Sequence, residues 1–121
     1  MKNKNFLQSA KCAIRGLEIG FCTERNFKIY CGIALLFLIL NILTGSGLYD
    51  YLFFLLLVCI VFSVEYINTS LERLCDSFSM EENTNMKFVK DVAAGSVLCM
   101  GIAFFGGEGA ILVLNIIKKF L

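Results

Sequence analysis

Histidine and proline are both absent from this 121-residue chain, and charged residues make up only 17% of it. The lack of histidine removes the commonest general base and metal ligand, so any acid–base chemistry must use carboxylates, lysines or cysteines. The lack of proline permits long, uninterrupted helices. A soluble domain normally carries about 25% charged residues. Because 58% of the residues are hydrophobic, the composition indicates a protein that lies in a lipid bilayer.

Neither the net charge nor the cysteines indicate a nucleic-acid partner or a disulfide-stabilised protein. The formal net charge is +1, whereas binding to nucleic acid would require a clustered basic face. No two of the six cysteines have CxxC spacing, and four lie in or beside apolar runs. A disulfide framework belongs to secreted, loop-rich chains. We therefore expect the cysteines to act as small hydrophobic side chains packed among helices.

Four helical segments are predicted, and the first, at about residues 4–22, is amphipathic. Its apolar side chains recur on one face from Phe6 to Phe21, while Lys11 and Arg15 belong to the opposite face. A basic polar face opposite an apolar face is typical of a helix in the membrane interface. A surface helix of a globular protein would show the same pattern, but the apolar segments that follow directly favour the membrane.

Three transmembrane spans are predicted at about residues 29–47, 49–76 and 92–117. The uncharged cores of the first two are shorter than the roughly 20 residues that a span needs, so polar residues must extend them. Such residues are costly on an isolated helix, and we infer an oligomer or a tight bundle. Residues 106–109 (Gly-Gly-Glu-Gly) interrupt the last apolar run. We interpret these glycines as close helix packing, and Glu108 has no assigned role.

The distribution of positive charge predicts the orientation in the membrane. Six lysines and arginines precede the first span, and Arg73, Lys87 and Lys90 lie between the second and the third. The connection at residues 44–50 has none. The positive-inside rule therefore places the N-terminus and the loop at residues 77–90 in the cytoplasm. Lys118 and Lys119, at the far end, go against this rule.

Three carboxylates share one face of the helix predicted for residues 49–76. At 100° per residue, Glu65, Glu72 and Asp76 fall within about 40° of one another, and Asn68 and Thr69 flank them. Like charges this close repel each other and need compensation. A divalent metal would supply it, since magnesium prefers one or two carboxylates together with phosphate oxygens. Glu72 or Asp76 alone would fit a solvated helix face equally well.

Two further groups should reach the same cytoplasmic edge. Glu24 lies between the amphipathic helix and the first span, and Lys90 and Asp91 open the last span. Carboxylates for magnesium, a lysine for phosphate and a glutamate for a hydroxyl proton are the groups that phosphoryl transfer needs. The chain contains no glycine-rich phosphate loop and no protein-kinase motif. Any nucleotide site must therefore be built from helix side chains.

The order and spacing of these residues resemble the prokaryotic diacylglycerol kinase family. The motif E-x-x-N-[ST]-x-x-E-x-x-x-D occupies residues 65–76, and Lys-Asp-Val-Ala-Ala-Gly follows at residues 90–95. Residues 15–17 (Arg-Gly-Leu) and 23–27 (Thr-Glu-Arg-Asn-Phe) look like the Gram-positive-type branch, most of whose members are undecaprenol kinases. The similarity runs from about residue 8 to the C-terminus.

The resemblance implies an all-α integral membrane protein, with an N-terminal amphipathic surface helix and three transmembrane helices in a single domain over residues 1–121. It implies a homotrimer whose neighbouring subunits share active sites on the cytoplasmic side of a bacterial cell membrane. The reaction would transfer the γ-phosphoryl group of MgATP to the hydroxyl of a lipid. Undecaprenol is the expected acceptor and diacylglycerol the alternative. A non-catalytic, ion-binding membrane scaffold is the competing class of function.

The resemblance also implies roles for single residues. Glu65 would take the hydroxyl proton, and Asn68 would orient the reacting groups. Glu24 and Glu72 would hold magnesium at the nucleotide. Nucleotide contacts would come from Glu81, Lys90 and Asp91, and support from Asp76, Thr69 and Arg15. The chain departs from the family at residues 81–83, which read Glu-Glu-Asn where members usually carry Glu-Tyr-His.

Overall fold

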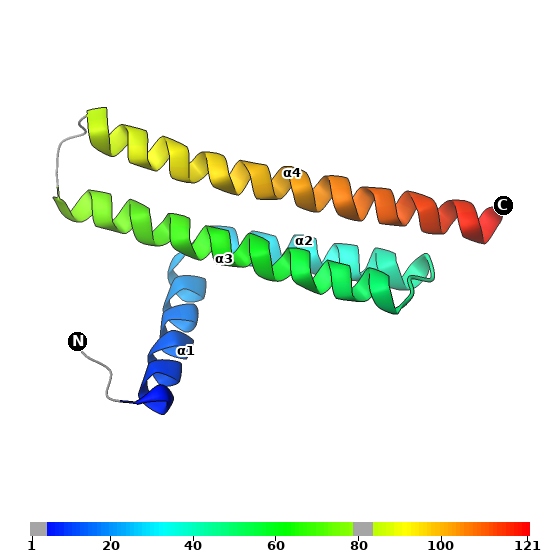
Figure 1. Ribbon diagram of the computed structural model, residues 1–121, viewed down its shortest axis with the longest axis horizontal. Coiled ribbons are helices and arrows are strands. Elements are labelled where there is room, and N and C mark those ends of the chain that lie inside the picture. The colour runs from blue at the N-terminus through cyan, green and yellow to red at the C-terminus, as the bar shows by residue number, and fades with distance from the viewer. Residues whose placement is uncertain (1–4, 79–83) are drawn as a thin grey trace.

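The computed structural model describes residues 5–78 and 84–121, which form four α-helices. Their bounds are Phe6–Thr23 for α1, Arg25–Leu43 for α2, Leu48–Phe78 for α3 and Thr84–Phe120 for α4. Helices α2, α3 and α4 pack along a common long axis, while α1 projects away from them (Figure 1). Each of the three packed helices is long and apolar enough to cross a membrane. The all-α integral membrane fold expected from the sequence is confirmed.

The helix ends differ from the expected spans, and α2 begins at Arg25, before the expected start at residue 29. The first span was expected at residues 29–47, but α2 already ends at Leu43, and residues 44–47 form the turn into α3. Gly45 in this turn has a φ of +76°, a conformation that glycine adopts without strain. The third span was expected from residue 92, but α4 begins at Thr84. Hydropathy marks only the apolar part of a helix, so it misses the polar turns that precede Val92.

Helix α1 is joined to the bundle at its C-terminal end. Asn5 caps its N-terminus, where the side-chain oxygen accepts a hydrogen bond from the Gln8 amide at 2.8 Å. At the other end Glu24 takes an extended conformation and redirects the chain into α2. None of the side chains of α1 is buried, and Phe6 is 89% exposed. With its axis across the three spans (Figure 1), α1 has the direction that a helix lying in the membrane interface requires.

Aromatic side chains form much of the contact between the helices. The Phe27 ring of α2 is completely buried and stacks on the Tyr66 ring of α3, with centroids 4.1 Å apart. Further along the bundle the Phe37 ring meets Phe104 of α4 edge-on at 5.2 Å. Most other large apolar side chains of the spans face outward. In a bilayer they meet lipid tails, which explains how a chain with so small a core can be so hydrophobic.

Residues 106–109 interrupt the apolar run but not the helix, since α4 is unbroken from Thr84 to Phe120, as the single predicted span requires. Close packing explains only one of the three glycines in this run. A Cβ atom added at Gly107 would lie 3.1 Å from the Phe53 ring and 3.3 Å from a Leu57 methyl, so the helices meet closely here. Cβ atoms at Gly106 or Gly109 would meet nothing within 4 Å.

Glu108 is an inter-helix contact at the end of the bundle away from Glu65. Its side chain is completely buried, and its Oε1 accepts a hydrogen bond from the buried Asn41 amide of α2 at 2.9 Å. Asn41 in turn accepts from the Ser46 hydroxyl at 2.6 Å, and Asn115 of α4 donates to Ser46 and to Asp50. A polar cluster thus joins α2, α3 and α4 inside an otherwise apolar bundle.

The environments of Lys119 and of five of the cysteines in the structure were not predicted from the sequence. Lys119, one of the basic residues that opposed the predicted orientation, donates to the Leu43 carbonyl at 3.0 Å and thereby caps the end of α2. The six cysteines form no disulfide, as expected. However, Cys75 is the only one that is buried, and the other five are exposed on the helices. Packing among helices therefore accounts for Cys75 alone.

Candidate functional site

The residues predicted for catalysis lie along one face of the last turns of α3, and their exposure increases toward its C-terminus. Glu65 is 3% exposed and Asn68 is 7% exposed. Glu72 is half-buried and Asp76 is exposed. The gradient arises because Asn26 and Tyr30 of α2 pack on Glu65, whereas the C-terminal end of α3 extends past α2 (Figure 1). One helix face therefore carries polar groups from the apolar interior to the aqueous end of the bundle.

Glu65 is held by two side chains from the first turns of α2. The Asn26 amide donates to Oε1 and the Tyr30 hydroxyl donates to Oε2, both at 3.4 Å. These distances are long for hydrogen bonds of their kind. Since a carboxylate has about four lone-pair sites, the two contacts leave Glu65 able to accept another hydrogen bond. This is the property that a general base requires before its substrate arrives.

Asn68 links the buried end of this face to its exposed end. Its amide donates to Oε1 of Glu72 at 3.2 Å. Its own side-chain oxygen is buried and has no hydrogen-bond partner among the described residues. A buried oxygen without a partner is costly, so this atom is suited to accept a hydrogen bond from a group that enters the site, or to contact a cation there.

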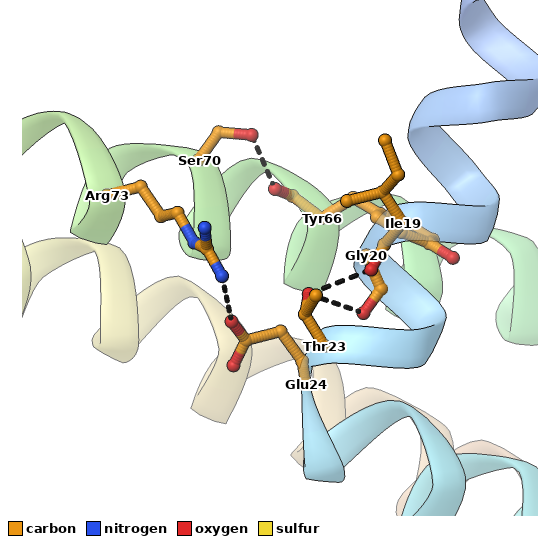
Figure 2. Close-up of polar contacts among 7 residues, drawn as sticks. All are labelled: Ile19, Gly20, Thr23, Glu24, Tyr66, Ser70 and Arg73. Carbon is orange, nitrogen blue, oxygen red and sulfur yellow. Dashed lines mark hydrogen bonds and ion pairs between the residues drawn. The ribbon is translucent and has the colours of Figure 1, made fainter.

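Glu24 and Glu72 line the same open recess, together with Arg73, Asp76 and Ser77. Figure 2 shows Arg73 of α3 pointing toward Glu24 at the junction of α1 and α2. The guanidinium Nη2 lies 3.7 Å from Glu24 Oε1, and the Arg73 side chain is 65% exposed. The nearby hydroxyls of Thr23 and Ser70 bond carbonyls of their own helices (Figure 2). The recess thus contains three carboxylates and one guanidinium.

Two lysines near the start of α4 form ion pairs with carboxylates at this end of the helix bundle. Lys90 contacts Asp76 of α3 at 2.5 Å, which brings the predicted phosphate contact beside the acidic recess. Asp91 pairs with Lys87 on its own helix at 2.9 Å. The Lys87–Asp91 pair is exposed and Lys90 is 35% exposed, so these pairs add little to stability.

An apolar groove of about 70 Å³ runs between α2, α3 and α4 on the membrane side of Glu65. Its walls are formed by ten residues: Tyr30, Ile33, Ala34, Val58, Val61, Phe62, Val97, Gly101, Phe104 and Phe105. Of these, only Tyr30 has a polar side chain, and its hydroxyl is the one that contacts Glu65. Along α3, Glu65 therefore lies between the last groove residue, Phe62, and the first recess residue, Glu72.

Three predicted residues are not brought into this cluster. Arg15 is exposed on α1 and has no contact with the carboxylates in the described part of the chain. Thr69 is half-buried on α3, without a described contact to the other site residues. Glu81 lies outside the described residues. The structure also adds three residues to which the sequence analysis gave no role at the site: Asn26, Tyr30 and Arg73.

The donor set fits a magnesium ion that is shared with phosphate. Within residues 5–78 and 84–121, no group of three carboxylate or cysteine side chains is placed to hold a metal by itself. Magnesium does not need such a group, because it is usually bound by one or two carboxylates together with waters and substrate phosphates. Glu24 and Glu72, which face one recess, and the unpartnered Asn68 oxygen meet this requirement.

Fold and site together define a membrane-embedded, all-helical enzyme whose polar centre lies at one end of its spans. The sequence pattern of the family described as prokaryotic diacylglycerol kinase matches residues 11–112. The chain belongs to this family and is a lipid kinase, which confirms the resemblance drawn from its motifs. No solved structure gives a significant match.

Two curated relatives are similar over most of this chain. An undecaprenol kinase of Bacillus subtilis is 31% identical over 97 residues, which cover 80% of this chain and 79% of the relative. A diacylglycerol kinase of Synechocystis is 32% identical over 107 residues, or 82% of this chain and 57% of the relative. The first supports the Gram-positive-type branch that residues 15–17 and 23–27 indicated.

Proposed function

We propose that this lipid kinase transfers the γ-phosphoryl group of ATP, with magnesium, to the terminal hydroxyl of a membrane lipid alcohol, and that undecaprenol is its principal acceptor. The observation that carries the proposal is the position of Glu65. This buried carboxylate follows Phe62 of the apolar groove along α3 and precedes Glu72 of the acidic recess. A reaction between an apolar substrate and a charged one would use a base at such a boundary.

Glu65 is proposed as the general base. A lipid alcohol whose chain lies in the groove presents its hydroxyl at the Tyr30 end, within reach of Glu65. Glu65 takes the hydroxyl proton while the alcohol oxygen attacks the γ-phosphorus. The bond from that phosphorus to the bridging oxygen breaks, and ADP leaves with the bond's electron pair. Asn68 orients the reacting groups, since its amide donates to Glu72 and its oxygen has no partner within the described part of the chain.

The nucleotide is proposed to bind over the acidic recess. Bound magnesium would neutralise charge on the β- and γ-phosphates there, and Glu24 and Glu72 would hold it. Lys90, beside the recess on Asp76, would contact phosphate, and Asp91 and Glu81 would contact the rest of the nucleotide. Arg73 can leave the exposed pair with Glu24 at little cost and offer its guanidinium to a phosphate oxygen.

Two observations favour undecaprenol over diacylglycerol. This chain covers 79% of the Bacillus subtilis relative, which carries the name undecaprenol kinase. It covers 57% of the relative named diacylglycerol kinase. The walls of the apolar groove also offer no polar side chain besides Tyr30. A polyprenol has one hydrocarbon chain and a single hydroxyl, whereas diacylglycerol has two chains with ester groups near its hydroxyl. Diacylglycerol is the alternative acceptor.

We propose a homotrimer in a bacterial cell membrane, with the N-terminus and the active site on the cytoplasmic side. The positive residues on the Glu65 side of the spans support the orientation. The many outward-facing apolar residues of α2, α3 and α4 leave room for contacts between subunits. Cross-linking of the purified protein in detergent would give a trimer, and a monomer as the only species would overturn this assembly.

The proposed function is tested by phosphate transfer from labelled MgATP with detergent-purified protein and each lipid alcohol in parallel. Label mainly on undecaprenol is the expected result. Label mainly on diacylglycerol would retain the mechanism and change the acceptor. Label on neither lipid, from folded protein with magnesium present, would contradict the proposed reaction.

A further inference from the structure

We propose that Tyr30 positions the base Glu65 and the lipid hydroxyl relative to each other, and thereby sets the rate of proton transfer from the lipid alcohol. The inference rests on the proposed function, because it assumes that a lipid alcohol occupies the groove. It assigns a role to a residue that the motif at residues 65–76 does not include, on a different helix. Two separate observations meet at this side chain.

The first observation is the contact between Tyr30 and Glu65. The Tyr30 hydroxyl donates to Oε2 of Glu65, while the Asn26 amide donates to the other carboxylate oxygen. Hydrogen bonds to both oxygens fix the rotation of the carboxylate about its terminal bond. Each oxygen keeps a second lone-pair site, so Oε2 can accept the lipid hydroxyl while Tyr30 still holds it. Asn26 and Tyr30 are one helical turn apart, so a single face of α2 supplies both donors.

The second observation is the place of Tyr30 in the groove. Tyr30 of α2, Phe62 of α3 and Val97 of α4 belong to the portions of the three helices nearest Glu65, and all three line the groove. The Tyr30 ring meets the Phe62 ring edge-on, with centroids 6.2 Å apart. Its hydroxyl is the only side-chain polar atom among the ten residues that form the walls. An alcohol that lies in the groove therefore meets its first polar partners at Tyr30 and Glu65.

These two observations give Tyr30 separable tasks. The ring forms part of the apolar wall, and the hydroxyl orients the carboxylate. Phenylalanine keeps the ring and removes only the hydroxyl, so Tyr30→Phe should impair proton transfer without changing how the lipid tail binds. A hydrogen bond to a charged group contributes more than a neutral one, but this one is long. We therefore expect kcat to fall about tenfold, with nearly unchanged KM for both the lipid and ATP.

The role of the groove wall in binding the lipid tail is tested separately, with Gly101→Leu. Gly101 lines the groove, and a Cβ atom at this position would meet nothing within 4 Å, so the backbone has room for a side chain here that narrows the groove. This variant should raise the lipid KM severalfold and leave the KM for ATP unchanged. Gly106→Leu is the matched control, because Gly106 lies on the same helix, has the same free space and does not line the groove. Tyr49→Phe, at the far end of α3, is the control for loss of a hydroxyl.

The experiment measures kcat and both KM values for purified full-length protein with undecaprenol, together with the thermal unfolding midpoint of each variant. The proposal predicts a lower kcat for Tyr30→Phe at an unchanged midpoint, and a raised lipid KM for Gly101→Leu alone. Wild-type kinetics in Tyr30→Phe, or loss of its fold, would overturn the role of Tyr30. Wild-type protein that phosphorylates no lipid alcohol would instead refute the proposed function.

Discussion

The polar contact between Asn41 and Glu108 should stabilise the bundle measurably, although it lies far from the proposed active site. Both side chains are completely buried, and the Asn41 amide donates to Glu108 Oε1 at 2.9 Å. The second carboxyl oxygen, Oε2, has no hydrogen-bond partner among the described residues. Asn41→Leu removes the only described side-chain donor to Glu108 and leaves a buried carboxyl group without a partner.

The expected cost follows from the environment of the pair. Hydrogen bonds between transmembrane helices contribute about 0.6 kcal/mol on average and about 1.7 kcal/mol at most. Leaving a buried polar group unsatisfied adds a penalty of about 1–3 kcal/mol. We therefore expect Asn41→Leu to lower the free energy of unfolding by about 2 kcal/mol. Replacing both partners with leucine removes the unsatisfied group as well, so the double variant should be more stable than the sum of the single effects predicts.

The test is a double-mutant cycle of Asn41→Leu and Glu108→Leu, with unfolding followed by circular dichroism in mixed micelles. A coupling energy of about 1 kcal/mol or more is expected for residues in direct contact. Effects that add to within about 0.5 kcal/mol would show that the two side chains do not interact, and would refute the reasoning. Kinase activity at temperatures where each variant is folded should remain unchanged, because the cluster lies at the opposite end of the bundle from Glu65.

Two further variants test the acidic recess and the close contact between α3 and α4. Arg73→Glu should raise the KM for MgATP about fivefold or more, because it places a further negative charge among the recess carboxylates. Arg73→Gln should change the free energy of unfolding by less than about 0.5 kcal/mol, because its ion pair is exposed; a larger loss would mean that the pair is structural. Gly107→Leu should destabilise the protein by about 1–3 kcal/mol through overpacking against Phe53 and Leu57. Gly106→Leu, measured in the same thermal unfolding assay, should be nearly neutral, and equal effects would contradict the packing.

The sequence was sufficient to predict the membrane fold and the face of α3 that carries the carboxylates. Apolar run length identifies spans directly, and helical periodicity alone brings Glu65, Glu72 and Asp76 together. The start of α4 was not predictable from hydropathy, because its first turns are polar. Glu108 could not be placed either, since its partner Asn41 is distant in the sequence and meets it only once α2 and α4 pack.

The partners of Glu65 were missed for the same reason, although a signal for them was present. Asn26 and Tyr30 are polar residues four apart at the start of an apolar helix, which places both on one face of α2. That spacing indicates a polar contact in the membrane but does not identify the partner. Arg73 was counted only as a positive charge, because its approach to Glu24 depends on the angle at which α1 joins the bundle.

The proposed reaction requires Glu65 as the base that takes the lipid hydroxyl proton. The measurement is transfer of labelled phosphate from MgATP to undecaprenol by wild-type protein and by Glu65→Gln. Glu18→Gln serves as the matched control, because Glu18 is exposed on α1 and belongs to no part of the site. We predict a loss of about a hundredfold or more for Glu65→Gln, with unchanged activity in the control and the same oligomer in all three proteins. Full turnover by Glu65→Gln would contradict the account.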